Sequence, residues 1–372
     1  MSTQSIIIPY HKDKEMIRYS VKLVVETIPP DVEIVVIGNN YNESELDLSF
    51  SYRNVRYYRI SQNLFYPKAI NYGVDVSHGD IITLLDPDVF VNPGWYEPLL
   101  KLICRDDIGA VGCKLINPSS GRIIDFGIAH TRFNAIHPLI GEKPDYPLAS
   151  SNRLVQSMCS AVLMTKKSLF DSVGGMNEDL PYSYTDIEYC LKLRELGYNT
   201  IACAESEVYH KGFTDDKNSK YYSFAYLNAD SKGLFYGNWY KKFDEDFREW
   251  MQTSYEFFIN QHPKLSRKIF LLDLSTVYNR KDYYDVISSF GFKTLDKHVV
   301  TIGVRDCTHI SLHQVVPFHL IETPAPILYF VDLFLCLADN DLWFKHRDIS
   351  SDMVIDRHGN IHMLTELREH MC

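Results

Sequence analysis

The sequence predicts an α/β protein with a mixed, mostly parallel sheet, followed by a helical segment and a small second α/β domain. Three observations support this fold class. Short, nearly continuous apolar runs alternate with helical stretches through the first part of the chain, as buried parallel strands do. Around residue 240 the composition becomes aromatic-rich, and from Lys268 a new strand–helix alternation begins. The length of 372 residues suits about two domains.

The expected elements follow one another in the order that strand–helix units require. Strands are expected at 5–9, 33–37, 55–60, 81–85, 108–116 and 154–165, with early helices at about 13–26 and 68–76. Later helices are expected at 224–240 and 243–261, and a strand at 268–274 precedes a helix near 283–290. These limits predict a first domain at 1–240, a helical linker at 241–262 and a small C-terminal α/β domain of open role at 263–372.

The charge and the cysteines narrow the class of protein. The formal net charge is −10, so the basic face of a general nucleic-acid binder is not expected. Eight cysteines occur without a C-x-x-C pair, which disfavours a zinc ribbon or a thiol redox centre and fits a reducing compartment. No stretch has the features of a signal peptide or a membrane span, so a cytoplasmic protein is expected.

The clearest candidate site is Asp86-Pro87-Asp88, directly after the apolar run 81–85. Two carboxylates at the carboxyl end of a buried strand can address one ligand, and hard oxygen ligands suit Mg²⁺ or Mn²⁺ carrying a diphosphate. The alternative is a solvated turn, in which Asp and Pro are ordinary residues. The position after a buried strand favours the metal site.

A second candidate is Asp186, at the start of a helical pattern. In one interpretation it is structural, because Thr185 and Glu188 form a capping-box pattern and an acidic first turn suits the helix dipole. In the other, it is a general base held at a helix terminus. The spacing does not decide between them.

A third candidate is His210, which ends the short apolar segment 207–210. A single His is most often structural, but beside Asp88 it would supply a nitrogen ligand that Mn²⁺ accepts. The polar stretch 212–220 that follows has the composition of a lid.

Several short segments in the first part of the chain follow one another in an order that is typical of a known family. They are 5–13 (SIIIPYHKD), 63–73 (NLFYPKAINYG), 86–88 with 93–95 (DPD and PGW), 174–178 (GGMNE), 185–188 (TDIE) and the strand-end His210. In these segments the chain resembles glycosyltransferase family 2, the sugar transferases of the GT-A fold. The resemblance covers about the first 215 residues.

The resemblance implies a metal-dependent, inverting transfer of a hexosyl or deoxyhexosyl group from a nucleotide sugar to a saccharide or lipid-linked saccharide acceptor, with Mn²⁺ or Mg²⁺ as cofactor. Cell-surface polysaccharide biosynthesis of the O-antigen or capsule type is the implied setting. The implied roles are metal binding by Asp88 and His210, catalysis by Asp186, donor binding by Pro9, Tyr10, Asn39, Lys68, Asn71, Asp86 and Asp88, and acceptor binding by Gly175, Asn177 and Glu178. Neither nucleic acid nor a transmembrane segment is expected, and a peripheral position at the inner face of the membrane is left open.

The chain departs from the family pattern at three places. Gly38, followed by Asn39 and Asn40, stands where an Asp is usual, so the nucleobase or ribose contact would fall to the Asn39 amide. Phe65 stands where Gly is common, and Thr185 replaces the Glu of the E-D pair. These departures support an alternative, a non-catalytic nucleotide-binding scaffold on the same fold. A sugar nucleotidyltransferase, which would also use an acidic pair and Mg²⁺, is the third hypothesis.

The segment 346–362 lies outside the resemblance. It is similar to a protein-kinase catalytic loop and hairpin, but Met353 stands at the metal-binding Asn and 365–367 replaces D-F-G. Phosphoryl transfer needs both metal ligands, so a strand hairpin with a His-Gly-Asn turn is expected. A kinase-like remnant without activity is the alternative.

Overall fold

The computed structural model of the chain describes residues 2–11, 13–39, 52–130, 135–139, 142–181, 183–212 and 221–244, with residues 246, 250 and 365 and a few short strands farther on. The chain divides into two units, Met1–Glu245 and Asp246–Cys372, and each is described by itself. The expected limits of the linker and of the C-terminal domain stay predictions.

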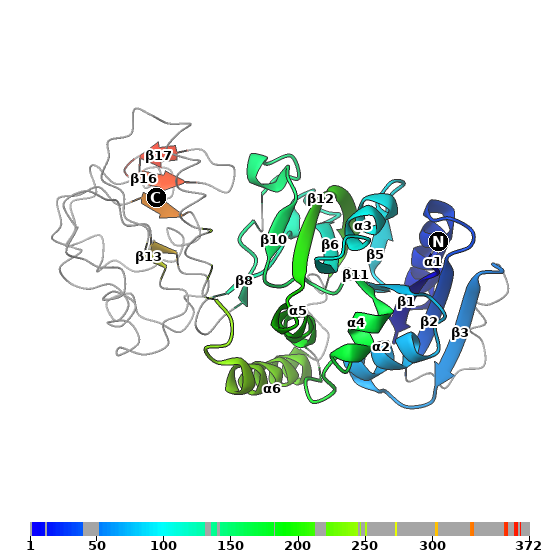
Figure 1. Ribbon diagram of the computed structural model, residues 1–372. Helices are drawn as coiled ribbons and strands as arrows, with labels where there is room; N and C mark the ends of the chain where they lie inside the picture. The colour runs from blue at the N-terminus through cyan, green and yellow to red at the C-terminus, as the bar shows by residue number, and fades with distance from the viewer. Residues whose placement is uncertain are drawn as a thin grey trace. The chain divides into compact units, whose positions relative to one another are not determined.

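A ten-stranded mixed sheet forms the N-terminal unit (Figure 1). Its strands are β1 (Gln4–Tyr10), β2 (Glu33–Asn39), β3 (Val55–Ile60), β4 (Ile81–Leu85), β5 (Val89–Val91), β6 (Ile108–Ile116), β7 (Ile123–Asp125), β10 (Arg153–Val155), β11 (Val162–Lys166) and β12 (Asn199–His210). The order along the main path is β10-β12-β6-β11-β4-β1-β2-β3, while β5 pairs with β12 and β7 with β6. A separate antiparallel pair joins β8 (Ala129–His130) and β9 (Ala135–Ile136).

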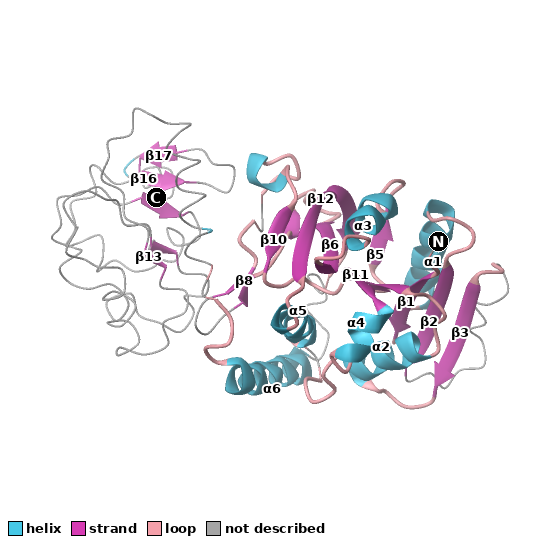
Figure 2. Cartoon of the chain, viewed as in Figure 1, coloured by secondary structure: helices cyan, strands magenta, loops and turns pink. Residues whose placement is uncertain are grey.

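Helices cover both faces of the sheet (Figure 2). They are α1 (Lys14–Thr27), α2 (Phe65–Asp75), α3 (Tyr96–Ile103), α4 (Lys167–Ser172), α5 (Thr185–Glu195) and α6 (Tyr221–Trp239), with a 3₁₀ turn at Pro147–Ala149. Helices α1 and α3 share one apolar core with Ile6 and Ile8 of β1. Helix α2 packs on the opposite face, where a Cβ on Gly73 would overlap Ile7.

Coverage on both faces explains the composition of the central strands. All five residues of β4 and all nine of β6 are buried. A strand buried on both faces has no polar alternation, which is why these segments are continuous apolar runs in the sequence.

The strand directions place several strand ends at one edge of the sheet. Strand β11 runs antiparallel to both β4 and β6, so β4 and β6 are parallel to each other, and β12 is parallel to β6. Strands β1 and β2 are parallel to β4 and to each other. The carboxyl ends of β1, β2, β4 and β12 therefore lie at the same edge, where ligands of parallel α/β sheets bind.

The predicted α/β class with a mixed, mostly parallel sheet is confirmed, and the early strands and helices lie within a few residues of their expected positions. One expected strand is wrong: 154–165 is not continuous but forms β10 and β11 with a connection at 156–161. The chain leaves the sheet there because β10 pairs with β12, whereas β11 lies between β4 and β6. Helix α6 confirms the expectation at 224–240.

In the second unit, short described strands form two sheets. Strand β13 (Leu272–Asp273) pairs with β14 (Ile302–Gly303), and β15 (Leu328–Phe330) pairs with β16 (Met353–Ile355), which is antiparallel to β17 (Ile361–Met363). The antiparallel β16–β17 pair agrees with the expected hairpin, whose His-Gly-Asn turn lies outside the described residues. The helix expected at 283–290 lies outside the described residues, as do nearly all of the expected lid at 212–220 and of the expected helix at 243–261. Among the helices described, none combines the length and the apolar composition needed to cross a bilayer.

Candidate active site

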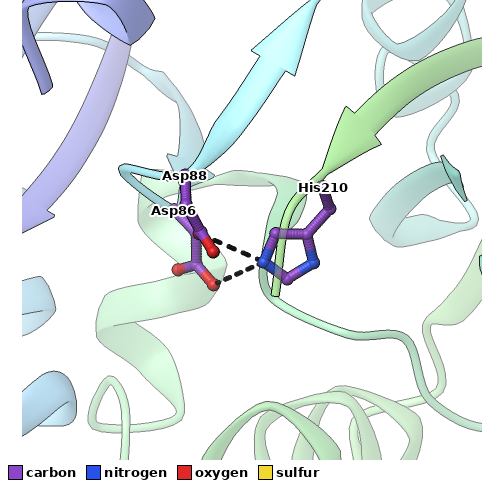
Figure 3. Close-up of side chains that lie close together, drawn as sticks. All are labelled: Asp86, Asp88 and His210. Atoms are coloured by element: carbon purple, nitrogen blue, oxygen red, sulfur yellow. Dashed lines mark hydrogen bonds and ion pairs between the residues drawn. The ribbon is translucent and has the colours of Figure 1, made fainter. Parts of the chain in front are cut away.

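Two carboxylates and an imidazole meet at the carboxyl edge of the sheet (Figure 3). Asp86 and Asp88 lie between β4 and β5, and His210 is the last residue of β12. Strand β5 pairs with β12 through Val89 and His210, and this pairing carries the imidazole to the two aspartates. The Nε2 atom of His210 is 3.1 Å from Oδ1 of Asp88 and 3.8 Å from Oδ2 of Asp86.

Burial and mutual charge shift the pKa values in this cluster. Burial is the main reason that the pKa of Asp86 is raised to about 7. The negative charges of Asp88 and Asp186 also raise it, whereas the positive charge of His210 lowers it. Burial also raises the pKa of Asp88, but its hydrogen bond with His210 and the charge of that ring outweigh burial and lower it overall. The pKa of His210 is lowered by burial but raised overall by Asp88. The cluster is therefore an acidic site that a cation would stabilise.

The three side chains fit a divalent cation. Their donor atoms lie within 4.8 Å of one another, and among the described residues no other group of His, Cys, Asp and Glu side chains meets this condition. Two carboxylate oxygens with an imidazole nitrogen suit Mn²⁺, and the carboxylates also suit Mg²⁺. His210 must lose the Nε2 proton to bind a metal, so metal binding would replace its hydrogen bond to Asp88.

Asp186 lies in the first turn of α5. Its Oδ2 accepts a hydrogen bond from the N–H of Ser160 at 3.0 Å, and its Oδ1 accepts one from the N–H of Ile187 at 2.9 Å. Burial raises the pKa of Asp186, although these two N–H groups act in the opposite direction. A carboxylate with a raised pKa binds a proton more readily, as a general base requires.

The capping box of the structural interpretation of Asp186 does not form at the start of α5. Thr185 is the first helical residue, and Tyr184 before it has a left-handed φ of 68° and provides no side-chain cap. Glu188 does not reach back to the helix start, because its carboxylate accepts hydrogen bonds from Asn177. The purely local interpretation of Asp186 thus loses the capping box that supported it.

Tyr66 and Ser160 connect Asp186 with the metal-fitting cluster. The Tyr66 hydroxyl is 2.9 Å from Oγ of Ser160, and it lowers the pKa of Asp86, against the larger effect of burial. The next residue, Ala161, accepts the main-chain N–H of Asp86 at 2.9 Å. Neither Tyr66 nor Ser160 was predicted from the sequence, where the only signal for Tyr66 is its position in the family-like segment 63–73.

The loop 174–178, expected on the acceptor side, is held by α2. The Asn71 side chain accepts from the N–H of Met176 at 2.9 Å and donates to its carbonyl at 2.9 Å and to Oε1 of Glu178 at 3.0 Å. Lys68 Nζ is 3.8 Å from Oε2 of Glu178. Gly175 has a φ of 69°, and a Cβ there would lie 2.6 Å from Oδ1 of Asn71. The positive φ and this close approach account for the glycine.

Asn177 joins the same loop to α5. Its Nδ2 donates to both carboxylate oxygens of Glu188, at 3.1 Å and 2.9 Å. Lys192 Nζ lies 3.3 Å from Oε1 of Glu188. Because Glu188 follows Asp186 by two residues on α5, these contacts fix the helix turn that carries Asp186.

The remaining expected donor-side residues lie at the carboxyl ends of β1 and β2. Pro9 and Tyr10 end β1, and Asn39 ends β2. A Cβ on Gly38 would overlap the ring of Tyr57 on β3, so packing accounts for the glycine that departs from the family pattern.

The Asn39 side chain is committed to contacts within the protein. Its Nδ2 donates to Oδ1 of Asn63 at 3.1 Å and to the carbonyl of Phe65 at 3.3 Å, while its Oδ1 accepts from the N–H of Leu64 at 2.7 Å. These bonds hold the turn that begins α2, where Phe65 has a left-handed φ of 58°. A direct contact of this amide with a nucleotide stays a prediction.

The N-terminal unit is thus a mixed α/β sheet with two carboxylates and an imidazole that fit a divalent cation at its carboxyl edge. Residues 5–143 match the family Glycosyl transferase family 2. This match lies within the N-terminal unit and agrees with the predicted resemblance to that family, and the observed sheet confirms the α/β class expected for it.

Three curated relatives are similar to part of the chain. An uncharacterised protein of Sinorhizobium fredii, y4gI, is 31% identical over 220 residues, which are 55% of this chain and 24% of that protein. The O-antigen biosynthesis protein RfbC of Myxococcus xanthus is 27% identical over 219 residues, 55% of this chain and 17% of that protein. The low-salt glycan biosynthesis hexosyltransferase Agl10 of Haloferax volcanii is 23% identical over 235 residues, 62% of this chain and 74% of that protein. The chain spans a quarter or less of the first two relatives, 24% and 17% of their lengths.

Two solved structures are similar at low identity. GalNAc-T7 with UDP, GalNAc and Mn²⁺ is 19% identical, with a TM-score of 0.48 over 56% of this chain and 44% of that chain. The mannosyltransferase PcManGT of Pyrobaculum calidifontis with GDP-Man and Mn²⁺ is 14% identical, with a TM-score of 0.46 over 61% of each chain.

Proposed function

We propose that the N-terminal unit is a metal-dependent, inverting glycosyltransferase that moves a hexosyl or deoxyhexosyl group from a nucleoside-diphosphate sugar to a hydroxyl of a saccharide. The observation that carries this proposal is the convergence of Asp86, Asp88 and His210 at one strand edge, with donor atoms within 4.8 Å of one another. A diphosphate needs positive charge at so acidic an edge, and a divalent cation supplies it. The family match supports the reaction class.

In this proposal Asp88 and His210 bind Mn²⁺ or Mg²⁺, and Asp86 contacts the donor ribose or a water on the metal. When bound, the cation offsets the negative charge that develops on the leaving nucleoside diphosphate. Asp186 takes the proton from the acceptor hydroxyl. One base is sufficient, because inversion in a single displacement forms no covalent intermediate.

The proposed substrate-binding residues are those that the family resemblance implies. Pro9, Tyr10, Asn39, Lys68 and Asn71 form the donor side, and Gly175, Asn177 and Glu178 form the acceptor side. Since the side chains of Asn39, Asn71 and Asn177 already make hydrogen bonds within the protein, we infer that they act by holding the loops that present main-chain groups to the substrates.

We extend the proposal to cell-surface polysaccharide biosynthesis with a saccharide or lipid-linked saccharide acceptor. Two relatives support this extension by name, an O-antigen biosynthesis protein and a glycan biosynthesis hexosyltransferase. A cytoplasmic location completes the proposal, and a peripheral position at the inner face of the membrane is left open. Its support is the buried, unpaired Cys113, Cys190 and Cys203, which suit a reducing compartment.

The test uses the full chain and a panel of UDP-, GDP- and TDP-sugars with Mn²⁺. Thermal shift first identifies the donors that bind, because a ligand of the folded state raises its stability. Slow release of nucleoside diphosphate, abolished by EDTA, is the expected result. Release of pyrophosphate would instead support a nucleotidyltransferase, and release of neither product would support a non-catalytic scaffold.

A further inference from the structure

Asp125 is a buried carboxylate to which the proposed reaction gives no role. It is the last residue of β7, and its side chain is 3% exposed. Its Oδ1 lies 2.7 Å from Nδ1 of His137, whose side chain is 33% exposed. Among the residues that the structure describes, no hydrogen-bond partner is found for the second oxygen, Oδ2. A buried carboxylate oxygen without a partner is costly, so this pair calls for an explanation.

Sheet pairing places Asp125 close to the candidate active site. Leu115 of β6 pairs with Asp125 on one side and with Val208 of β12 on the other. His210 lies two residues beyond Val208 on the same strand. Strand β7 thus brings Asp125 to the edge of the sheet that carries the metal-fitting cluster.

The electrostatic influence of the pair points to the same place. Behind the larger effect of burial, the negative charge of Asp125 raises the pKa of Asp186 and the positive charge of His137 lowers it. The negative charge of Asp125 also raises the pKa of His210, as the charges of Asp86 and Asp88 do. His137, the more exposed residue of the pair, therefore lies near the proposed base Asp186.

A carboxylate that holds one nitrogen of an imidazole sets both the orientation of the ring and its tautomer. Because a carboxylate accepts hydrogen bonds, the proton sits on Nδ1 of His137, and Nε2 is the nitrogen that can contact a substrate. A sugar hydroxyl both donates and accepts, so it suits Nε2 in the neutral and in the protonated ring. A phosphate oxygen suits only the protonated ring.

We propose that His137, oriented by Asp125, hydrogen-bonds a hydroxyl of a sugar bound beside Asp186. This inference rests on the proposed glycosyl transfer. The sugar is either the one transferred from the donor or the one that accepts it, and both present the same chemistry. Hydrolysis of the donor by water involves only the first, whereas transfer involves both.

The experiment compares wild type with His137→Ala, using His78→Ala as the matched control. His78 is also paired with a carboxylate, at 2.9 Å from Oε1 of Glu33, but Glu33 is the first residue of β2, at the opposite edge of the sheet. Three quantities are measured: the affinity for UDP, GDP and TDP with Mn²⁺, kcat/KM for hydrolysis of the nucleotide sugar that wild type turns over, and kcat/KM for transfer to p-nitrophenyl glycosides.

His137→Ala should leave nucleoside-diphosphate affinity unchanged and lower a sugar-dependent rate about 10-fold, which corresponds to about 1.4 kcal/mol. A fall in both hydrolysis and transfer identifies the donor sugar, and a fall in transfer alone, with a raised acceptor KM, identifies the acceptor. Rates within two-fold of wild type, or an equal loss of UDP, GDP or TDP affinity, would overturn the inference. Wild type that turns over no nucleotide sugar would instead refute the proposed function, and with it this contact.

Asp125 is a positioning residue in this proposal, because it acts through His137. Asp125→Asn should therefore change the same rate as His137→Ala, and the double variant should be no slower than His137→Ala alone. Additive losses would show that Asp125 acts independently of His137 and would contradict the positioning role. If Asp125→Asn does not fold, the His137 comparison still decides the proposed contact, since that side chain is partly exposed.

Discussion

The main-chain N–H of Ser160 donates a hydrogen bond to Oδ2 of Asp186 at 3.0 Å. The carbonyl of the next residue, Ala161, accepts a hydrogen bond from the N–H of Asp86 at 2.9 Å. One short stretch before β11 therefore positions both the proposed base and the first aspartate of the metal-fitting cluster. Since both contacts use main-chain groups of this stretch, side-chain substitutions of the two aspartates can test their chemistry while the stretch stays in place.

Asp186→Asn should leave donor and acceptor binding nearly intact and lower the transfer rate by roughly 10²–10⁴-fold, the usual contribution of a positioned proton acceptor. Asn keeps one oxygen, which can accept the Ser160 N–H, and loses the acceptor of the Ile187 N–H, but it also removes a buried charge. These opposing effects should limit the change in the free energy of unfolding to about 1 kcal/mol. Initial rates at saturating donor and acceptor, with urea unfolding of the same preparation, provide the measurement. A rate within a few-fold of wild type would leave the mechanism without its base.

Gly175→Ala should destabilise the protein more than Gly174→Ala. Both glycines have positive φ values, 69° and 77°, but a Cβ at 175 would lie 2.6 Å from Oδ1 of Asn71, whereas at 174 no atom lies within 4 Å. The left-handed conformation alone costs about 1–2 kcal/mol, and the overlap should add about 1–3 kcal/mol.

Urea unfolding of the two variants measures the difference. It isolates the contacts of the added Cβ with Asn71 at 2.6 Å and with the Phe170 ring at 3.0 Å, because the backbone strain is common to both. Equal losses of stability would show that Asn71 moves aside at no cost and that the loop 174–178 is not held as described.

The metal-free protein should lose stability as the pH rises through neutrality. The pKa of Asp86 is raised from 3.8 to about 7 by burial in the folded state, so the stability that its protonation contributes is present below about pH 4 and is lost as the pH rises through about 7. The raised pKa of His210 acts in the same direction at higher pH.

Thermal unfolding of wild type and Asp86→Asn in EDTA, between about pH 5.5 and 8, checks this. The difference between the two unfolding midpoints should move in favour of Asp86→Asn as the pH rises. A constant difference, or one of the opposite sign, would show that burial does not raise the pKa of Asp86 as described.

The sheet, and the two aspartates and the histidine at its edge, could be predicted from the sequence. Central strands such as β4 are buried on both faces, so their apolar runs are visible without a structure. Asp86 and Asp88 were found because they follow such a strand directly, and His210 because it ends one. Their convergence could be expected because the carboxyl ends of parallel strands meet at one edge.

The parts that could not be predicted depend on contacts distant in sequence. The connection between β10 and β11 was hidden in one apolar run, because Met158 and Ala161 within it are buried as strand residues are. The capping-box pattern at Thr185 failed because Glu188 has a better partner, Asn177, on another loop. Asp125 and His137 carry no local signal, because only the pairing of β7 with β6 brings them to the site.

The most direct test of the account is calorimetric titration of UDP, GDP and TDP into wild type and Asp88→Asn, each with Mn²⁺ and with EDTA. We expect binding to wild type that requires Mn²⁺, a loss of at least about 100-fold in Asp88→Asn, and a smaller loss in His210→Ala, while His78→Ala stays like wild type. Asp88→Asn should keep its thermal unfolding midpoint within a few degrees, because Asn can still accept a hydrogen bond from His210. Unchanged Mn²⁺-dependent affinity in a folded Asp88→Asn would contradict the metal site and the reaction proposed on it.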